Sequence, residues 1–324
     1  MVKRFVLLGL LALGALLVGI VVGAVRIPIA DAVRYLFGQG DDTSAAIVRH
    51  LRAPRVLLAF SVGGCLAVTG AVLQALVRNP LADPYLLGLS GGAGLGAVLA
   101  IALRWGGVWI VPASAFVGAL VAIVLVYRLA MVAGAGLDTR VLLLAGVVVS
   151  AFAGALLAAV VALSPATELR NAMLWLLGGF DAASWRALLV FFVYAAVPLG
   201  LLWMASRPLD LLSLGEEPAL FLGVDVERLK RLLYIAASLL TAAAVAVSGI
   251  IGFVGLVIPH AVRMIWGHAH RSLIPASFLL GGTLLVLADA VARTAFAPQE
   301  LPVGIVTALV GVPAFAFLLR RWAS

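Results

Sequence analysis

The stretch SRPLDLLSLGEEPALFLGVDVERLKR, residues 206–231, carries nine charged residues among its 26, whereas only 11% of the 324-residue chain is charged. The sequence on either side returns to apolar runs long enough to cross a bilayer. We therefore interpret residues 206–231 as a soluble loop between membrane helices. Pro218 suits a first helical turn, and the loop then has an apolar face at Ala219, Leu220, Leu222 and Val224. A segment that merely connects two helices does not need such a face.

The composition indicates a membrane protein. Hydrophobic residues make up 65% of the chain, the mean hydropathy is +1.21 and there are 34 glycines, all well beyond an average soluble domain. We predict an all-α polytopic membrane protein with one transmembrane domain over residues 1–324. The net charge of +8 does not indicate nucleic-acid binding, because 20 of the 22 basic residues are arginines scattered between apolar blocks. Cys65 is the only cysteine, so an internal disulfide and a thiolate metal cluster are excluded.

Ten apolar segments are predicted to cross the membrane: residues 5–25, 56–77, 86–103, 108–132, 141–163, 187–205, 232–250, 252–266, 273–291 and 303–319. The run 232–258 is too long for one comfortable span, so its glycines around 248–255 predict a break. Residues 173–177 are predicted as a short, half-buried helix, 26–55 as a loop and 133–140 as a turn. The glycines at 63, 64 and 70 and those within 88–96 favour close helix packing.

An even number of spans places both termini on one side of the membrane. The pairs Lys3-Arg4 and Arg320-Arg321 predict that this side is the cytoplasm. Arg52, Arg55 and Arg293 lie at the outer ends of helices, against this bias, and we predict that they form a docking patch for an acidic partner protein. Anchoring to lipid phosphate is the alternative interpretation of these arginines.

Ion-coupled transport is not indicated, because the predicted spans carry almost no charge at their centres. Asp289 is the main candidate, and its spacing from Arg293 favours a local ion pair over a proton relay. The only lysines are Lys3 and Lys230, and neither lies in a nucleotide-binding P-loop. If ATP drives transport, a separate ATPase must supply it, and docking of that ATPase is the leading interpretation of residues 206–231.

An ion-coupled secondary transporter, an intramembrane enzyme and a passive channel remain the alternatives. The four histidines, His50, His260, His268 and His270, form no HExxH motif, and nothing in the spacing selects Ser150 or Ser248 as a partner of His260. We therefore predict no catalytic residue and no metal site. A passive channel would not explain the amphipathic loop.

Several stretches carry a family resemblance over essentially the whole chain. They are LRAPRVLLAFSVGGCLAVTGAVLQALVRNPLADPYLLGLSGGAGLG (51–96), LWLLGGF (174–180), LGEEPALFLGV (214–224), SGIIGFVGLVIPHAVR (248–263), LADAVAR (287–293) and ELPVGIVTALVGVPAFAFLL (300–319). The chain resembles the permease subunits of the FecCD family, which belong to binding-protein-dependent ABC importers for iron chelates, haem and vitamin B12.

The resemblance implies a type II ABC importer permease fold with about ten transmembrane helices in the inner membrane. It also implies a homodimer with a second copy of the chain, two ATP-binding cassette subunits that hold ATP and Mg, and one extracytoplasmic substrate-binding protein. No cofactor is expected in this chain. The Gly178-Gly179-Phe180 ending resembles the vitamin B12 type more than the haem type, so a cobalamin or related corrinoid is favoured, with ferric siderophore next and haem third.

The resemblance also implies roles for individual residues. The ATPase-coupling residues are expected at Leu212, Gly215, Glu216, Ala219, Leu222, Gly223 and Val224. An inner gate is expected at Asn79, Pro80 and Leu81 and at Asp138 and Thr139, although Asp138 replaces the small polar residue typical of the family. The outer pathway is expected to be lined by Met173, Trp175, Leu177 and Phe180. In the family, arginines equivalent to Arg52, Arg55 and Arg293 receive acidic residues of the binding protein.

Overall fold

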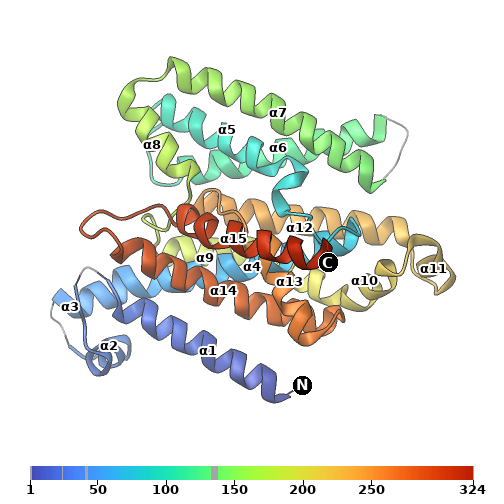
Figure 1. Cartoon of the computed structure of the whole chain (residues 1–324). Helices are drawn as coiled ribbons and strands as arrows, with labels where there is room; N and C mark the ends of the chain where they lie inside the picture. The colour runs from blue at the N-terminus through green and yellow to red at the C-terminus, as the bar shows by residue number, and fades with distance from the viewer. Residues whose placement is uncertain (1, 24, 41–42, 133–137, 324) are drawn as a thin grey trace.

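The computed structural model describes residues 2–23, 25–40, 43–132 and 138–323, the side chains of 318–323 excepted, and the elements it describes are all helical (Figure 1). In chain order they are α1 (Val2–Val21), α2 (Ile29–Leu36), α3 (Thr43–Ala46), η1 (Ile47–Arg52), α4 (Ala53–Leu76), η2 (Pro84–Leu87), α5 (Leu89–Ala102), α6 (Ile110–Val132), α7 (Thr139–Leu163), α8 (Ala166–Leu176), α9 (Trp185–Met204), α10 (Ser206–Ser213), α11 (Glu216–Phe221), α12 (Val226–Ser248), α13 (Val254–Trp266), α14 (His270–Thr294) and α15 (Val303–Ala323).

The predicted number of membrane helices is confirmed. Within the described residues, seven helices are long and apolar enough to cross a membrane, namely α1, α6, α7, α9, α12, α14 and the continuous run Thr43–Leu76 that contains α4. Three shorter apolar helices, α5, α13 and the described part of α15, bring the total from seven to ten. The half-buried helix predicted at 173–177 is the end of α8.

Two of the predicted boundaries are wrong. The region 26–55 is largely helical rather than a loop, because α2, α3 and η1 occupy most of it and η1 runs directly into α4. The third span begins at Leu89 rather than at residue 86, since Gly88 adopts φ +82 and separates the short helix η2 from α5. Most of the turn predicted at 133–140 lies outside the described residues.

Helix α4 is the central helix of the molecule, and almost every residue along it is buried. It packs against α14, α12 and α13. The glycines of α4 permit this close packing, as predicted: a Cβ added at Gly63 would lie 2.4 Å from the carbonyl oxygen of Gly281, and one at Gly70 would lie 1.9 Å from that of Gly255. The backbones therefore touch where the glycines occur.

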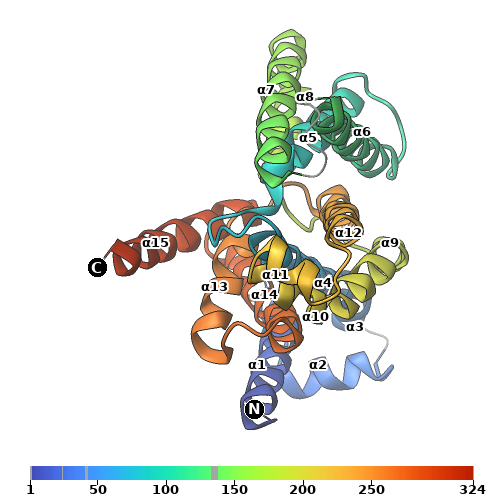
Figure 2. The same cartoon turned by 90° about the vertical axis from the view of Figure 1, so that its right-hand side faces the viewer.

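Helices α5, α6, α7 and α8 form a second group beside this core, with α12 between the two groups (Figures 1 and 2). The predicted packing role of the α5 glycines is confirmed. A Cβ at Gly92 would lie 2.4 Å from the Gly118 carbonyl oxygen, and one at Gly96 would lie 2.1 Å from that of Ser114. Both glycines therefore hold α5 against α6.

The predicted break between α12 and α13 is also confirmed. Helix α12 ends at Ser248, and Gly249 reverses the chain at φ +67. Other segments satisfy the non-helical backbone that follows. The Gly179 N–H donates to the Ser248 carbonyl at 2.8 Å, while the Tyr85 hydroxyl accepts from the Ile251 N–H at 3.1 Å and donates to its carbonyl at 3.0 Å. Irregular backbone is tolerated at membrane depth only when protein groups satisfy it in this way.

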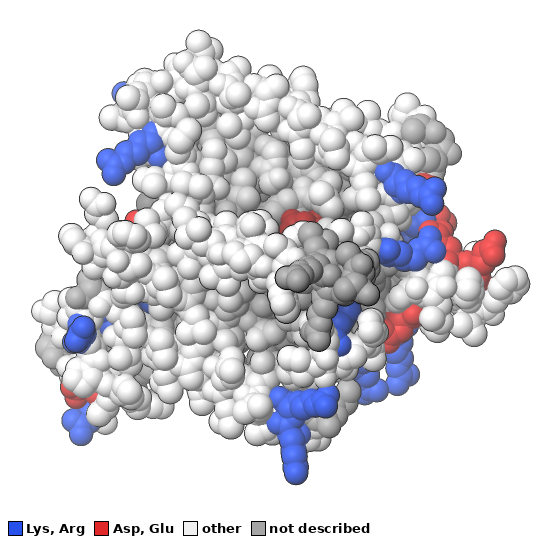
Figure 3. Space-filling model, in the orientation of Figure 1, with Lys and Arg blue, Asp and Glu red and all other residues white. Residues whose placement is uncertain are grey.

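The two ends of the helices are polar and the sides are not. Charged side chains gather at these ends, most of all at the end formed by α10 and α11, whereas the face between the ends is mainly uncharged (Figure 3). We call the two ends the α11 end and the α3 end. Helix α1 begins and α15 ends towards the α11 end (Figure 1). The molecule thus has an apolar belt with two polar faces.

Candidate functional site

The segment with helices α10 and α11 lies at one end of the molecule (Figure 1), where α10 packs against α4 and α14. Leu209 and Leu212 of α10 are buried against the bundle, and Ala219 of α11 is buried as well. The Gly223 N–H donates to the Leu220 carbonyl at 2.9 Å and closes α11. The segment is therefore a folded platform rather than an extended linker.

The apolar surface of this platform differs from the predicted one. Its exposed apolar side chains are those of Leu214, Leu220, Phe221 and Leu222. Phe221 is 91% exposed, although it is the largest apolar side chain in the segment. The predicted face included Ala219 and Val224, which instead turn inward because α11 packs this side against its own neighbours. Only Leu222 of the predicted coupling residues presents a large apolar side chain outward.

Charged contacts fix the platform to the membrane helices. The Lys230 ammonium of α12 lies 3.1 Å from the Glu216 carboxylate, and the Lys230 side chain is buried. His270 at the start of α14 binds Asp210 of α10 twice: its N–H donates to Oδ1 at 2.8 Å, and its Nδ1 lies 2.6 Å from the same oxygen. These contacts thus connect the platform directly to α12 and α14.

The two turns predicted to form the inner gate lie together at the α11 end. The Thr139 hydroxyl donates to the carbonyl of Leu76, the last residue of α4, at 3.5 Å. Asn79 Oδ1 accepts the Leu81 N–H at 2.9 Å, and Asp138 Oδ1 accepts the Arg140 N–H at 2.8 Å. Asp138 therefore caps the first turn of α7, a role that the small polar residue of the family pattern would also fill.

The same inner turn continues through Pro80 into Asp83, whose Oδ1 accepts the Tyr85 N–H at 2.9 Å. Burial raises the pKa of Asp83, and the hydrogen bond from the Tyr85 N–H opposes that shift. Leu81 remains exposed beside it.

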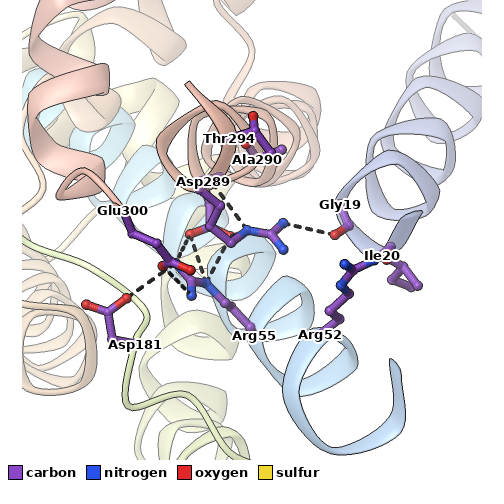
Figure 4. A network of polar contacts seen from close by, with 10 residues as sticks. Gly19, Ile20, Arg52, Arg55, Asp181, Asp289, Ala290, Thr294 and Glu300 are labelled. Carbon is purple, nitrogen blue, oxygen red and sulfur yellow. Dashed lines mark hydrogen bonds and ion pairs between the residues drawn. The ribbon is translucent and has the colours of Figure 1, made fainter. Parts of the chain in front are cut away.

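The three arginines predicted to form a docking patch converge at the α3 end (Figure 4). Asp289 accepts hydrogen bonds from Arg55, with Nη2 at 3.0 Å from Oδ1, and its Oδ2 lies 3.0 Å from Nε of Arg293. The predicted local pair between Asp289 and Arg293 is thus confirmed, and Arg55 joins it. Arg52 lies nearby and donates to the carbonyls of Ile20 and Val21 at the end of α1.

This geometry does not support a free cationic patch. Arg52 and Arg293 are each only 5% exposed, because both guanidinium groups bind carbonyls of α1 or a buried carboxylate. Arg55 also bridges to Glu300 at 2.9 Å and to Asp181 at 3.4 Å, and the Asp181 side chain is 80% exposed. The surface of the cluster is therefore acidic as well as basic. The docking role of Arg52 and Arg293 remains a prediction, and both side chains are buried in this conformation.

The segment predicted to line the outer pathway divides into two parts. Met173 and Leu177 of the α8 region are exposed, and Trp175 packs partly against the core. Phe180 is almost completely buried in this conformation, and its place on the pathway remains a prediction. The chain turns inward after Gly178, whose carbonyl accepts the Val303 N–H at 2.9 Å, and this turn carries Phe180 into the core.

Comparison with known proteins agrees with this arrangement. The model of the FecCD transport family matches residues 10–321. The chain is 46% identical over 279 residues to the cobalamin import system permease protein BtuC of Halobacterium salinarum, covering 86% of this chain and 74% of that protein. It is 43% identical over 279 residues to the hemin transport system permease protein HmuU of Yersinia pestis, covering 84% and 82%.

A solved structure is similar over nearly the whole chain. It is described as an inward-facing conformation of a metal-chelate type ABC transporter, and it matches with a TM-score of 0.90 at 33% identity over 99% of this chain and 100% of that one. The ten apolar helices, the folded platform and the family match over residues 10–321 lead to one conclusion. The chain belongs to the FecCD transport family.

Proposed function

We propose that this chain is the permease subunit of a binding-protein-dependent ABC importer that moves a metal chelate into the cytoplasm. ATP hydrolysis on a separate subunit, which holds ATP and Mg, drives the transport. The observation that carries the proposal is the platform of α10 and α11, which exposes Leu214, Leu220, Phe221 and Leu222 to water. A contiguous apolar surface of this kind, rimmed by charges, is typical of a protein interface.

The assembly that this function requires is a homodimer of the permease, two ATP-binding cassette subunits at the α11 end and one extracytoplasmic binding protein at the α3 end. The chain would lie in the inner membrane with the α11 end and both termini in the cytoplasm. Support comes from Lys3 and Arg4 at the start of α1, because the positive-inside rule places such pairs in the cytoplasm.

For the substrate we favour cobalamin or a related corrinoid, with ferric siderophore second and haem third. The relatives named above include a cobalamin permease at 46% identity and a hemin permease at 43%, so identity alone does not decide between them. The Gly178-Gly179-Phe180 turn favours the corrinoid. Competition between the three chelates for uptake by the whole importer tests this ranking.

At the α3 end, we propose that the binding protein docks over the cluster around Arg55. Arg52, Arg55 and Arg293 are the candidates for this contact, and Arg55 is the most accessible of the three, with a side chain that is 13% exposed. Met173 and Leu177 are the candidates for the outer pathway, and the turns at Asn79 and Asp138 are those for the inner gate.

The platform provides the test of the proposal. Phe221→Asp and Leu222→Asp each place a charge in the centre of the apolar surface, so we expect either variant to lose co-purification of the ATPase subunit and ATP-driven uptake. Phe37→Asp is the matched control, because Phe37 follows α2 at the α3 end and is 82% exposed. Normal assembly and uptake by the Phe221→Asp variant would disprove the coupling role.

A further inference from the structure

A cavity of about 490 Å³ lies at the α11 end, beside the turn with Asn79 and Pro80 that is a candidate for the inner gate. It is lined by the end of α4 with the following turn, by α10, by the last turns of α13 and by the loop before α14 and the first residue of α14. Gln74, Ser213, Arg263 and His270 each reach it from a different one of these helices. The cavity thus lies directly beside the platform.

The ionisable residues that line the cavity are all basic. Arg78, His260 and His268 line it together with Arg263 and His270, and none of its lining residues is acidic. Two carboxylates lie next to this wall: Glu216 is 3.9 Å from Arg78 and 3.1 Å from Lys230, and Asp210 is 2.6 Å from His270. Among the described residues, no group of three or more His, Cys, Asp or Glu side chains could hold a metal ion. Two guanidinium groups also make the cavity unfavourable for a cation.

Arg263 is held in place without a carboxylate partner in the described chain. Its Nη1 donates to Gln74 Oε1 at 2.6 Å. The amide of Gln74 is fixed in turn, because its Nε2 donates to the carbonyls of Ala82 and Leu256 at 3.3 and 3.2 Å. Burial of a guanidinium without a counter-ion costs desolvation free energy. An anion in the cavity would offset this cost through its attraction to the guanidinium.

His270 supplies the second, independent observation. Its side chain is buried, and its Nε2 is enclosed without a hydrogen-bond partner. The carboxylate of Asp210 can only accept, so Nδ1 carries the ring proton of the neutral imidazole. Nε2 then becomes a donor when the ring takes up a second proton, and an anion in the cavity would accept that hydrogen bond.

We propose that this cavity binds an anion of the phosphate class, either a lipid head group or free phosphate, between Arg263 and His270. The planar guanidinium can bind two oxygens of such a group, and protonated His270 can bind a third. Met264 lines the same cavity, and both Met264 and Ile265 are exposed beside it, which leaves room for the acyl chains of a lipid. The site is a property of the permease alone, so its test does not depend on the proposed transport activity.

The first test measures binding by isothermal titration calorimetry to the full-length permease in a neutral maltoside detergent. The probes are inorganic sulfate and dihexanoyl phosphatidylglycerol, whose charges stay constant near neutral pH. We expect saturable binding of at least one probe, weakened roughly tenfold or more in Arg263→Gln. Arg263→Lys keeps the charge but not the planar guanidinium, so its affinity for the probe should lie between those of the wild type and Arg263→Gln. Arg228→Gln is the matched control, because Arg228 lies at the same end with an 87% exposed side chain and should bind like the wild type.

The second test compares binding at about pH 5 and about pH 8, well below and well above the ordinary histidine pKa of about 6.5. The groups around His270 are Asp210 from α10, Arg78 after α4, and His260, Arg263 and His268 from α13 and the loop after it. We expect tighter binding at the lower pH. His270→Gln should remove most of this dependence, whereas His268→Gln should retain it because His268 is exposed.

The outcomes separate the sources of the anion. Binding of sulfate as tight as that of the lipid indicates a soluble anion, and much tighter binding of the lipid indicates a head group. Absence of saturable binding of both probes, or unchanged binding in a folded Arg263→Gln variant, overturns the proposal. If neither probe binds and Arg263→Gln instead loses the ATPase subunit, the cavity receives a carboxylate of that subunit, and the phosphate proposal is likewise overturned.

Discussion

Asp289 is the buried carboxylate on which the α3 end depends. It is 1% exposed, and two guanidinium groups, those of Arg55 and Arg293, lie within 3.0 Å of its oxygens. The pair joins α4 to α14, the two helices that form the centre of the molecule. Such a cluster stabilises the fold only while all its members are present, since removal of one leaves the others charged and buried.

We therefore expect Asp289→Asn to lower the free energy of unfolding by roughly 3 to 5 kcal/mol. Unfolding of the purified permease in a detergent titration measures this change. Asp31→Asn is the control, because Asp31 pairs with Arg34 at 4.0 Å on the surface and exposed pairs contribute less than about 1 kcal/mol. If Asp289→Asn lowers the free energy of unfolding as little as the control does, the structural role of the cluster is contradicted.

The sequence could predict only part of this cluster. Asp289 and Arg293 are four residues apart on one helix, so their contact follows from helical spacing. Arg55 lies 234 residues away along the chain, and no periodicity relates it to Asp289. The same limit explains why the burial of two of the predicted docking arginines was not foreseen. The charge pattern showed that arginines lie at the α3 end, but the carbonyls of α1 that bury Arg52 and Arg293 are contacts made only in the folded chain.

At the scale of the elements, the crossing of α4 and α13 depends on Gly70. A Cβ there would lie 1.9 Å from the carbonyl oxygen of Gly255, which belongs to the backbone and cannot rotate away. We expect Gly70→Ala to push the helices apart and to cost about 1 to 3 kcal/mol or more. Thermal unfolding followed by size-exclusion chromatography measures the loss. Gly154→Ala is the matched control, because nothing lies within 4 Å of a Cβ at Gly154, and it should leave the melting temperature unchanged or slightly raised.

The break between α12 and α13 depends on a hydroxyl group from another element. Tyr85→Phe would leave the N–H and the carbonyl of Ile251 without the partner that both now share. We expect a loss of about 1 to 3 kcal/mol, the usual cost of unsatisfied buried polar groups. In Tyr234→Phe, only a bond to the helical carbonyl of Ile123 is lost, so the effect should be smaller. Equal stabilities of the two variants, measured in the same detergent, would contradict this account.

The positions of the helices were more predictable than which of their side chains point outward. Long apolar runs and the glycines around 248–255 predicted ten helices and the break correctly, because bilayer thickness and backbone satisfaction leave few other solutions. The platform was predicted as well, but its outward face was not. Helix α11 has only six residues, too few for periodicity to show that Ala219 faces inward and Phe221 outward. The exposed phenyl ring could have been suspected from its size alone, since a charged loop rarely includes one without a contact for it.

At the scale of the whole molecule, the position of the buried charges bears on how transport is driven. Within the described chain, the buried side chains of acidic residues, basic residues and histidines are those of Arg52, Asp289 and Arg293 at the α3 end and of Lys230 and His270 at the α11 end. Each of the acidic and basic groups among them has a partner at its own end. An ion-coupled carrier instead needs ionisable groups along the path at membrane depth. The platform at the α11 end offers the other route, through a partner that hydrolyses ATP.

We therefore expect uptake by the complete importer in proteoliposomes to depend on ATP and to be insensitive to a protonophore or a sodium ionophore. The physical reason is that the membrane helices, as far as the structure describes them, carry no series of charges through which an ion gradient could act. The contacts Lys230–Glu216 and His270–Asp210, in contrast, connect the platform to α12 and α14. Vesicles without ATP supply the baseline, and ATP hydrolysis is followed in parallel as a control for intact complexes. A collapse of uptake on addition of the ionophore, while hydrolysis continues, would show that a gradient does the work and would restore the ion-coupled alternative. Uptake that persists with the gradient dissipated and fails in the Phe221→Asp variant would place the energy input at the platform.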